Sequence, residues 1–492
     1  MRREARTVTF NSWEFLLFYP IVALLYFVLP KKMRWPMLLI ASYYFYGCYQ
    51  FKLLPLIMAT TLISWGASHI VHKTESRALK RLALTATLVV CFGVLFFYKY
   101  FNFLSSSITG LIAFFGGSPE PLMLNLVLPV GISFYTFQTL SYVIDVYRGD
   151  VEPEKNLFFY ALFVSFFPQL VAGPIERPGN LIPQLREAHS FTGENFVKGS
   201  KHMIVGFFKK ICVADMISVY VSAIFNNPSE ASALGIIIAA LLFGIQIYCD
   251  FSGYTDIAIG CARIMGIRLM KNFDHPFMAT SIKEHWSRWH ISLSSWFKDY
   301  LYFPLGGSRR GRARTLFNIM VVFVVSGLWH GAAWTFVLWG ALHGMYQIIG
   351  TLTWKKRNML LGKIGLSERS VGIMWLRRFN TYILISISWL FFRANSISDT
   401  GILFSRLFSA WDVGISGTLS HMGFDLTGIL TTVLSILTLI AIDRMLTYDD
   451  NADGSAVLTR GGSFIYYVWM IFFMWAVLLS KDMASTFIYF QF

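Results

Sequence analysis

Two histidines lie in segments that are otherwise dominated by apolar and aromatic residues. His290 belongs to the segment RWHISLS (288–294), and His330 belongs to SGLWHG (326–331). A titratable ring at hydrocarbon depth is costly to keep there, so in a membrane it is by default a sign of function. Imidazole is also the side chain whose unperturbed pKa lies near neutrality, so it can accept a proton and return it within one turnover. The two histidines therefore predict a proton-transfer site inside a membrane.

The composition indicates the same environment. The chain has 492 residues, of which 55% are hydrophobic and only 14% are charged, whereas soluble domains carry about 25% charged residues. We therefore expect an all-α polytopic membrane protein, because a helix satisfies its backbone hydrogen bonds within the lipid. The first apolar run is expected to stay as an anchor, because Pro30, Lys31 and Lys32 follow it without a small-residue cleavage site.

Apolar runs that can cross a bilayer, about 20 residues long in a helix, recur along the whole chain. Several are short or contain glycine, proline and polar residues, which favours re-entrant, broken or interfacial helices. About ten to twelve passes are expected in total. The runs cover residues 15–29, 37–51, 54–70, 82–101, 126–146, 157–171, 203–225, 234–251, 316–349, 382–392, 426–442 and 464–479.

Basic loops predict the orientation, because cytoplasmic loops carry an excess of lysine and arginine. The first loops place more basic residues on one side of the membrane than on the other, so the N-terminus is predicted outside. The richer side holds Lys31, Lys32, Arg34, Lys73, Arg77, Lys80 and Arg81, and the poorer side holds Arg2, Arg3, Arg6 and Lys52.

The net charge of +15 is concentrated in the middle of the chain. One interpretation is positive-inside topology together with attraction to anionic lipid. The other is that this face also docks an acidic partner, such as a carrier protein, or an anionic acyl donor. Nucleic acid is not expected as a partner, because there is no basic and aromatic surface outside the membrane-associated sequence. The basic residues are Arg263, Arg268, Lys271, Lys283, Arg288, Lys298, Arg309, Arg310, Arg312 and Arg314.

The cysteine and histidine patterns do not predict a disulfide framework or a metal site. None of the five cysteines forms a Cys-x-x-Cys pair, and no His-Glu-x-x-His motif is present. No domain linker or internal repeat is evident either. We therefore expect one membrane domain over residues 1–492, with the chemistry in the middle at about 128–344.

The segment 284–302 has an apolar stripe at helical spacing, interrupted by charged and polar residues. It predicts a helix on which His290 and Ser294 lie one turn apart on a common face. The run 316–349 contains His330 and His343 and is punctuated by glycines, which predicts close approach of another helix or of a substrate.

Two further polar segments fall at the ends of apolar runs. Asp250 lies in QIYCDFSGYTD (246–256), where it could cap the next helix or orient a catalytic ring by accepting its N–H. The segment PQLVAGPIER (168–177) contains two prolines and predicts a broken helix, with Glu176 and Arg177 as a candidate ion pair.

Taken together, these segments resemble the membrane-bound O-acyltransferases, and within that family the bacterial alginate O-acetyltransferase branch. The resemblance covers essentially the whole chain, and the motifs occur in the order found in the family. They are LPVGISFY (128–135), AGPI (172–175), DFSGY (250–254), RWHISLSSW (288–296), WHG (329–331) and the terminal FIYFQF (487–492).

The resemblance implies a ring of membrane helices, with re-entrant and interfacial helices, around a central funnel or tunnel. It also implies that His330 is the near-universal histidine of the family and that His290 is the second family position. His330 is then the expected general base, and His290 orients the donor or supports the developing charge. Trp329, Asp250, Ser294 and His343 are possible supporting residues. For His343, a packing or hydrogen-bonding role stays open beside a catalytic one.

The implied reaction transfers an acetyl group from a cytoplasmic thioester, acetyl-CoA or an acyl carrier protein, to hydroxyls of an exported polysaccharide. The thioester is a co-substrate, and no bound cofactor is expected. One alternative is an acyl conduit that hands acetyl to a separate periplasmic or extracellular transferase, and another is D-alanyl or peptidoglycan O-acyl transfer. A solute transporter is a third class, which the lack of visible repeats disfavours. The expected location is the bacterial cytoplasmic membrane.

Overall fold

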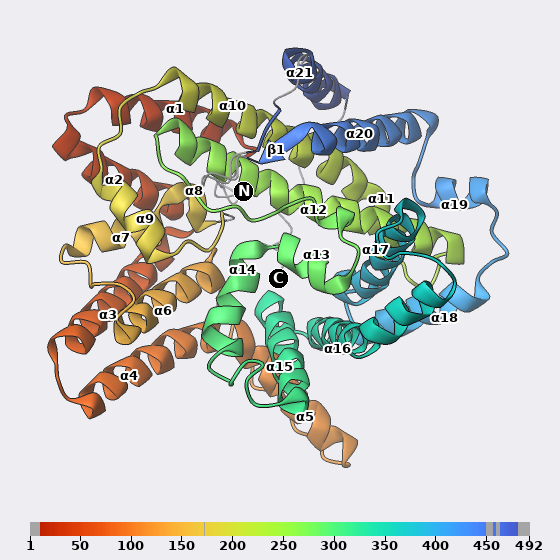
Figure 1. The fold of residues 1–492 in the computed structure, drawn as a ribbon, viewed down its shortest axis with the longest axis horizontal. Helices are drawn as coiled ribbons and strands as arrows, with labels where there is room; N and C mark the ends of the chain where they lie inside the picture. The colour runs from red at the N-terminus through yellow and green to blue at the C-terminus, as the bar shows by residue number, and fades with distance from the viewer. Residues whose placement is uncertain (1–9, 172, 449–455, 459–462, 481–492) are drawn as a thin grey trace. The chain divides into compact units, whose positions relative to one another are not determined.

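The computed structural model describes residues 10–171, 173–448, 456–458 and 463–480. Most of the described chain is helical, which confirms the expected all-α class (Figure 1). The strands in the described residues are the short β1 (Leu446–Tyr448) and β2 (Ala456–Leu458), which pair antiparallel with Thr447 opposite Val457. Several sequence features lie outside the described residues: Arg2, Arg3 and Arg6, Ala172, and the terminal segment 487–492.

The chain divides into two compact units. Unit one comprises Met1–Met203, Tyr254–Met270 and Asp449–Ser455, and unit two comprises Ile204–Gly253, Lys271–Tyr448 and Ala456–Phe492. Two of the boundaries fall inside helices, one in α10 (Gly193–Phe207) and one in α12 (Ala233–Ile264). A single domain over residues 1–492 stays a prediction.

Unit one contains the N-terminal helices, in which α3 packs on α4 and α6, and α2 packs on α7. Its helices are α1 (Trp13–Val28), α2 (Lys31–Gln50), η1 (Phe51–Leu53), α3 (Leu54–Lys73), α4 (Arg77–Leu95), η2 (Phe96–Tyr100), α5 (Phe101–Phe114), α6 (Ile132–Arg148), α7 (Leu157–Ser165), α8 (Phe167–Leu170) and α9 (Pro178–Arg186).

The proline-rich segment of unit one forms a broken helix, as expected. Phe166, which precedes the α8 turn with Pro168, leaves the helical region with φ −51° and ψ 109° and so ends α7. Gly131 precedes α6 in the left-handed region, with φ 72°, and a Cβ there would lie 2.7 Å from the backbone oxygen of Leu170. Only glycine fits this conformation and this close approach without strain.

Unit two contains the histidines and the longest helices. Besides its part of α12 it comprises η3 (Phe208–Asp215), α11 (Met216–Phe225), η4 (Pro276–Met278), α13 (Ile282–Arg288), α14 (Ile291–Phe297), η5 (Lys298–Tyr302), α15 (Arg312–His330), α16 (Trp334–Lys363), α17 (Val371–Arg393), α18 (Ile397–Ser409), α19 (Ile415–His421), α20 (Leu426–Met445) and α21 (Ser463–Ser480). Figure 1 shows the short helices α13 and α14 next to α15 and α16.

The run 316–349 is two helices rather than one. The chain leaves helical geometry at Gly331, with φ −158° and ψ 148°, and α16 returns along α15. A Cβ on Gly327 would lie 2.2 Å from the backbone oxygen of Phe336, and one on Gly340 would lie 2.3 Å from that of Phe323. The glycines therefore serve close helix packing, which was one of the two uses expected for them.

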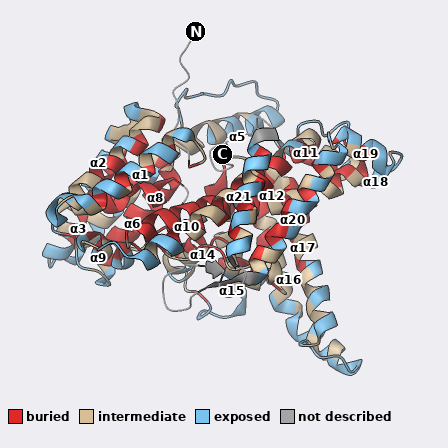
Figure 2. Ribbon diagram, turned by 90° about the horizontal axis from the view of Figure 1, so that it is seen from above, coloured by how far each residue is buried: buried red, intermediate tan, exposed pale blue. Residues whose placement is uncertain are grey.

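Five helical stretches are long and apolar enough to cross a membrane, among the described residues. They are Lys31–Lys73, Arg77–Phe114, Ala233–Ile264, Arg312–His330 and Leu426–Arg444, and the first of these joins α2 and α3 through η1. Shorter apolar helices, α1 and Phe464–Leu478 within α21, add to them. Figure 2 shows that α12 is largely buried and that the far ends of α16 and α17 are exposed. The chain is a multi-pass membrane protein.

Candidate active site

The two histidines singled out in the sequence lie together in unit two. The ring centroids of His290 and His330 are 6.5 Å apart, and the residues are 0% and 3% exposed. His330 is the last residue of α15, a membrane-length helix, and His290 precedes α14. Forty residues of sequence separate them, so the fold, not the local sequence, creates this pair.

Aromatic rings form the walls around the pair. The ring of His330 lies 5.0 Å from Trp329, 5.1 Å from Trp339 and 5.6 Å from Phe392, measured between centroids. The ring of His290 lies 5.9 Å from Trp329. These walls keep the local dielectric low, which strengthens any electrostatic interaction with a reacting group.

The helix expected over 284–302 is broken at the histidine itself. α13 begins with a capping arrangement, in which the Ser281 hydroxyl accepts the Glu284 N–H at 3.1 Å, and it ends at Arg288. His290 then adopts the left-handed region, with φ 43° and ψ 55°. A non-glycine residue in this region carries strain of about 1–3 kcal/mol, and residues strained in this way are found mainly at functional sites. The expectation of one continuous helix was therefore wrong.

Ser294 lies one turn after His290, as expected, and its hydrogen bonds run to backbone carbonyls of this segment. Its backbone N–H donates to the carbonyl oxygen of His290 at 2.9 Å, and its hydroxyl donates to the carbonyl oxygen of Trp289 at 3.3 Å. Both bonds stabilise the chain reversal between α13 and α14. The structure therefore gives Ser294 a role in shaping the backbone around His290.

Asn272 holds the reversal in place, and sequence reasoning missed it. Its backbone oxygen accepts the N–H of Ile291 at 2.9 Å, and its side-chain Oδ1 accepts the N–H of Ser292 at 3.1 Å and the Ser292 hydroxyl at 2.8 Å. Asn272 is 1% exposed and lies in a loop without periodicity, so no pattern in the sequence singled it out.

The same asparagine sets the tautomer of His290. Because Oδ1 accepts a backbone N–H, the orientation of the amide is fixed. The Nδ1 of His290 lies 3.2 Å from this oxygen and must therefore donate its hydrogen. The Ser292 hydroxyl, 3.4 Å from Nδ1, has its hydrogen directed to Asn272. In the neutral ring the lone pair is consequently on Nε2, the form of histidine that can accept a hydrogen.

His343 has protein partners at both ring nitrogens. The indole N–H of Trp286 donates to Nδ1 at 3.2 Å, and Nε2 lies 2.9 Å from the hydroxyl of Ser388. That hydroxyl donates to the carbonyl oxygen of Ile385 at 2.6 Å, so Nε2 is the donor towards it. His343 therefore connects α13, α16 and α17, which matches the hydrogen-bonding role left open for it.

Asp250 does not cap a helix, because it lies in the interior of α12. Its Oδ1 accepts a hydrogen bond from the ammonium of Lys210 at 2.6 Å, and the same ammonium lies 2.8 Å from Oδ1 of Asp215. All three side chains are nearly fully buried. The cap interpretation was wrong because Asp250 finds its partner 40 positions away in η3, a relation that sequence spacing does not reveal.

Asp250 nevertheless neighbours the site through the chain. The next residue, Phe251, meets the His290 ring edge-on, with centroids 4.6 Å apart and an interplanar angle of 88°. The buried ion pairs fix the turn of α12 that carries this phenylalanine. Asp250 therefore acts on the His290 ring through its chain neighbour Phe251.

The basic residues in the middle of the chain do not form a single surface. Arg263 is 3% exposed, Lys271 pairs with Asp274 at 3.1 Å, and Arg288 pairs with Glu284 at 2.9 Å. Four arginines, by contrast, are exposed around the start of α15: Arg309, Arg310, Arg312 and Arg314. They surround the positive end of a helix dipole, so this part of unit two attracts anions.

Glu176 of unit one pairs differently from the sequence expectation. Its carboxylate accepts the backbone N–H of Met270 at 2.5 Å and the amide of Asn180 at 2.7 Å. Burial raises the pKa of Glu176 to about 7, against the opposing effect of these hydrogen bonds. Its contribution to folding is therefore largest below pH 4.5 and is lost as the pH rises through about 7.

The segment that contains the site is similar to a known protein family. Residues 153–360 match the model of the membrane-bound O-acyltransferase family, and this segment contains both site histidines. A Pseudomonas putida protein named "Probable alginate O-acetylase" is 35% identical over 99% of this chain and 100% of its own length. A peptidoglycan O-acetyltransferase of Helicobacter pylori is 33% identical over 79% of this chain and 78% of its own.

A more distant relative shares part of the chain. The teichoic acid D-alanyltransferase of Bacillus subtilis is 29% identical over 45% of this chain and 58% of its own length. An end-to-end relationship at 35% identity, together with the match over the segment that carries the buried histidines, leaves one assignment. This chain belongs to the membrane-bound O-acyltransferase family and is an O-acyltransferase.

Proposed function

We propose that this protein transfers acetyl groups from a cytoplasmic thioester to hydroxyls of an exported, alginate-like polysaccharide. The observation that carries the proposal is the buried pair His290 and His330, 6.5 Å apart at the end of a membrane helix. Its full-length similarity to the alginate O-acetylase of P. putida supports acetyl as the group and an exopolysaccharide as the acceptor.

In this reaction His330 is the general base. As the sugar oxygen attacks the thioester carbonyl, the ring accepts the hydroxyl proton. The C–S bond then breaks, and the same proton passes to the departing thiolate, so the ring returns to its neutral form. The products are a sugar acetate and a free thiol. The aromatic walls around His330 exclude water, which would otherwise hydrolyse the thioester.

The tautomer of His290 supports one of its two expected roles. A neutral ring with its lone pair on Nε2 cannot donate a hydrogen bond to a developing oxyanion from that atom. It can accept a hydrogen bond from an N–H or O–H group of a substrate. We therefore assign to His290 the orientation of the donor, with its own direction fixed by Asn272.

The exposed arginines at the start of α15 fit an anionic donor or an acidic carrier protein on the cytoplasmic side. The proposed location is the bacterial cytoplasmic membrane with the N-terminus outside, and the distribution of basic loops supports this orientation. Neutralising Arg309, Arg310, Arg312 and Arg314 together is expected to raise the donor concentration needed for half-maximal rate. An unchanged donor dependence would restrict these residues to topology.

The test uses purified protein in sealed lipid vesicles, with labelled acetyl thioester inside and acceptor glycan outside. Wild-type protein is expected to label the glycan, and His330→Ala is expected to lose this activity while inserting normally. His72→Ala, a change at an exposed histidine, is the matched control. Retained labelling by His330→Ala would remove the base assignment.

The same vesicles separate direct transfer from an acyl relay. Labelling of the glycan by this chain alone supports direct transfer. Labelling that appears only after an extracytoplasmic transferase is added would make the chain a conduit that presents acetyl to its partner. Exchanging the glycan for peptidoglycan tests the acceptor class that the H. pylori relative suggests.

A further inference from the structure

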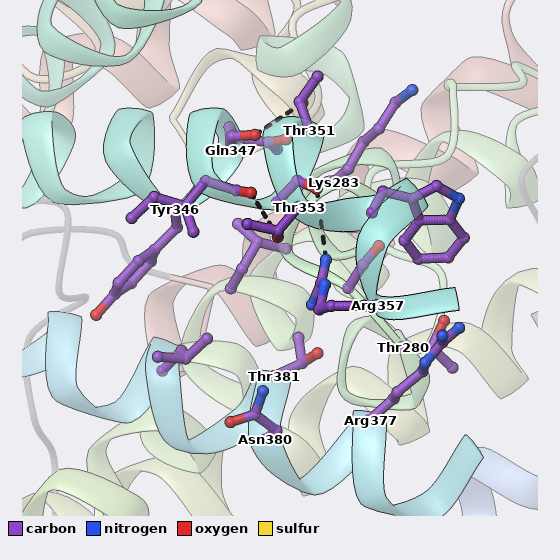
Figure 3. Close-up of a pocket in the computed structure, with 16 residues that line it drawn as sticks. Thr280, Lys283, Tyr346, Gln347, Thr351, Thr353, Arg357, Arg377, Asn380 and Thr381 are labelled. Carbon is purple, nitrogen blue, oxygen red and sulfur yellow. Dashed lines mark hydrogen bonds between the residues drawn. The ribbon is translucent and has the colours of Figure 1, made fainter. Parts of the chain in front are cut away.

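A pocket of about 550 Å³ opens in unit two, between the start of α13, the second half of α16 and the first half of α17 (Figure 3). His290, His330, Asn272 and His343 do not line it. Its two ends have different chemistry, which indicates the type of molecule it would hold.

One end of the pocket is cationic. Figure 3 shows Tyr346 on one side of the pocket and Arg377 on the other, with Arg357 between them and the Lys283 ammonium directed away from both arginines. The guanidinium of Arg377 stacks 4.9 Å from the ring of Trp354, and that of Arg357 lies 5.9 Å from the same ring. Stacking holds both groups in fixed directions, which favours recognition of a phosphate.

Local hydrogen bonds further fix this end. Arg377 donates to the amide oxygen of Asn358 at 2.7 Å, and its other terminal nitrogen lies 3.5 Å from the carboxylate of Glu368. Arg357 donates to the carbonyl oxygen of Gly350 at 3.4 Å. With two arginines against the one carboxylate paired with them, a positive excess stays at this end of the pocket.

Apolar side chains also line the pocket. Ile349 is 56% exposed, and Tyr346 and Leu384 add further apolar surface to the lining. From Ile349 to Arg357 the helix rises about 12 Å, at 1.5 Å per residue. Over that distance the wall changes from hydrocarbon to charge. Two exposed tryptophans, Trp354 and Trp375, accompany the change, as tryptophans do at a membrane interface.

We propose that this pocket binds an anionic phospholipid of the bilayer, with the phosphate on Arg357 and Arg377, Lys283 adding positive charge nearby, and the upper acyl chain along Tyr346, Ile349 and Leu384. A soluble phosphate compound has no hydrocarbon chain to cover the exposed apolar side chains of the pocket. Basic pockets between membrane helices are typical sites for acidic headgroups. The site is independent of the acetyl-transfer proposal, because its evidence involves other residues.

The position of the pocket gives the lipid a structural effect. Ser281 caps α13 and Lys283 lies in its first turn, and both line the pocket. The same helix carries Trp286, whose indole N–H donates to His343. A bound lipid would therefore connect the start of α13 to α16 and α17 from the outside. Binding is expected to raise the thermal unfolding midpoint of the protein.

The test measures lipid binding by the full-length protein in neutral detergent. Native mass spectrometry would count adducts of phosphatidylglycerol and of phosphatidylcholine, and thermal unfolding would be followed with each lipid added. The variant Arg357→Gln/Arg377→Gln is compared with Lys355→Gln/Lys356→Gln. The control removes the same charge from neighbouring exposed positions of α16 that do not line the pocket.

Wild-type protein and the lysine control are expected to prefer phosphatidylglycerol. The arginine variant is expected to bind it at least about tenfold more weakly, on the basis of about 1 kcal/mol for each basic residue at a membrane surface. Lys283→Gln, a change at an exposed side chain, is expected to weaken binding about fivefold and serves if the double variant folds poorly.

Three results would overturn the proposal. The first is equal binding of the two lipids, and the second is equal binding by the arginine variant and the lysine control. The third is displacement of phosphatidylglycerol by soluble coenzyme A at concentrations that support acetyl transfer. This third result would assign the pocket to the phosphate of the acyl donor instead.

Discussion

His290 and His343 are buried in the same unit, but their ring nitrogens are used differently. In His343 both nitrogens bind side chains of neighbouring helices, Trp286 on one side and Ser388 on the other. In His290 the backbone is strained, with φ 43°, and Nδ1 donates to Asn272. Burial and residue type are therefore the same, and the hydrogen bonds differ: His343 joins two neighbouring helices through their side chains, whereas Asn272 orients the ring of His290.

The comparison would break if both histidines had equal effects on the reaction. We expect His330→Gln and His290→Gln to lower kcat by about 10²–10⁴-fold, because each removes a positioned ring from the reacting groups. His343→Gln is expected to lower kcat less than tenfold, because glutamine can still donate and accept between α13 and α17. Initial rates in the vesicle assay check this, and equal losses at all three positions would remove the distinction.

Asn272 sharpens the comparison, because it acts on one histidine only. Asn272→Ala is expected to lower kcat by about 10-fold or more, since the His290 ring loses its fixed tautomer and direction. Asn272→Asp keeps the acceptor but adds negative charge, which favours the protonated imidazole and raises the pKa of His290. As the pH falls, activity that needs the neutral ring would then be lost at a higher pH in the variant than in the wild type.

The pH–rate profile separates these roles from a folding defect. Asn272→Asp should move the acidic limb of the profile to higher pH, with the maximal rate largely kept. A uniform loss of rate at every pH, with no displacement of the limb, would show that Asn272 only supports the fold. His343→Gln should leave the limb in place.

For His343 the expected effect is on stability. His343→Leu leaves the indole N–H of Trp286 without this acceptor in a buried place, and an unsatisfied buried group costs about 1–3 kcal/mol. The free energy of unfolding in detergent, followed by tryptophan fluorescence, is expected to fall by this amount. A variant as stable as the wild type would show that His343 does not hold the three helices together.

The smallest expected effect is at Ser388. Ser388→Ala removes the partner of the His343 Nε2–H and is expected to cost about 1 kcal/mol of unfolding free energy. Ser386→Ala is the matched control, because the Ser386 hydroxyl donates to the carbonyl oxygen of Tyr382 in its own helix. If both serine variants lose the same stability, the bond to His343 contributes nothing beyond the local helix.

Helix positions were predictable from the sequence where the signal is local. The run 54–70 corresponds to α3 (Leu54–Lys73), and the run 15–29 corresponds to α1 (Trp13–Val28). Both are continuous apolar segments with flanking polar residues, and periodicity and length are enough to find them. The family resemblance, now shown by the comparisons, added the expectation that His290 and His330 would meet.

The parts that sequence reasoning missed depend on contacts between distant residues. The reversal at His290 is held by Asn272, 18 positions earlier, and Asp250 is neutralised by Lys210, 40 positions earlier. A helical pattern in 284–302 contains no sign of either partner. The run 316–349 is one apolar segment in the sequence, because the hydrophobicity does not change between the end of α15 at His330 and the start of α16 at Trp334.

The glycine contact between α15 and α16 has a consequence for how molecules reach the histidines. With Gly327 and Gly340 bringing the two backbones so close that any side chain there would collide, these helices cannot part sideways at this level without losing their packing. A molecule that reaches His330 therefore does not pass between α15 and α16 at the level of these two glycines. A tether of fixed reach, such as the long arm of a thioester carrier, would suit access past this closed wall better than a bulky group that needs the wall to open.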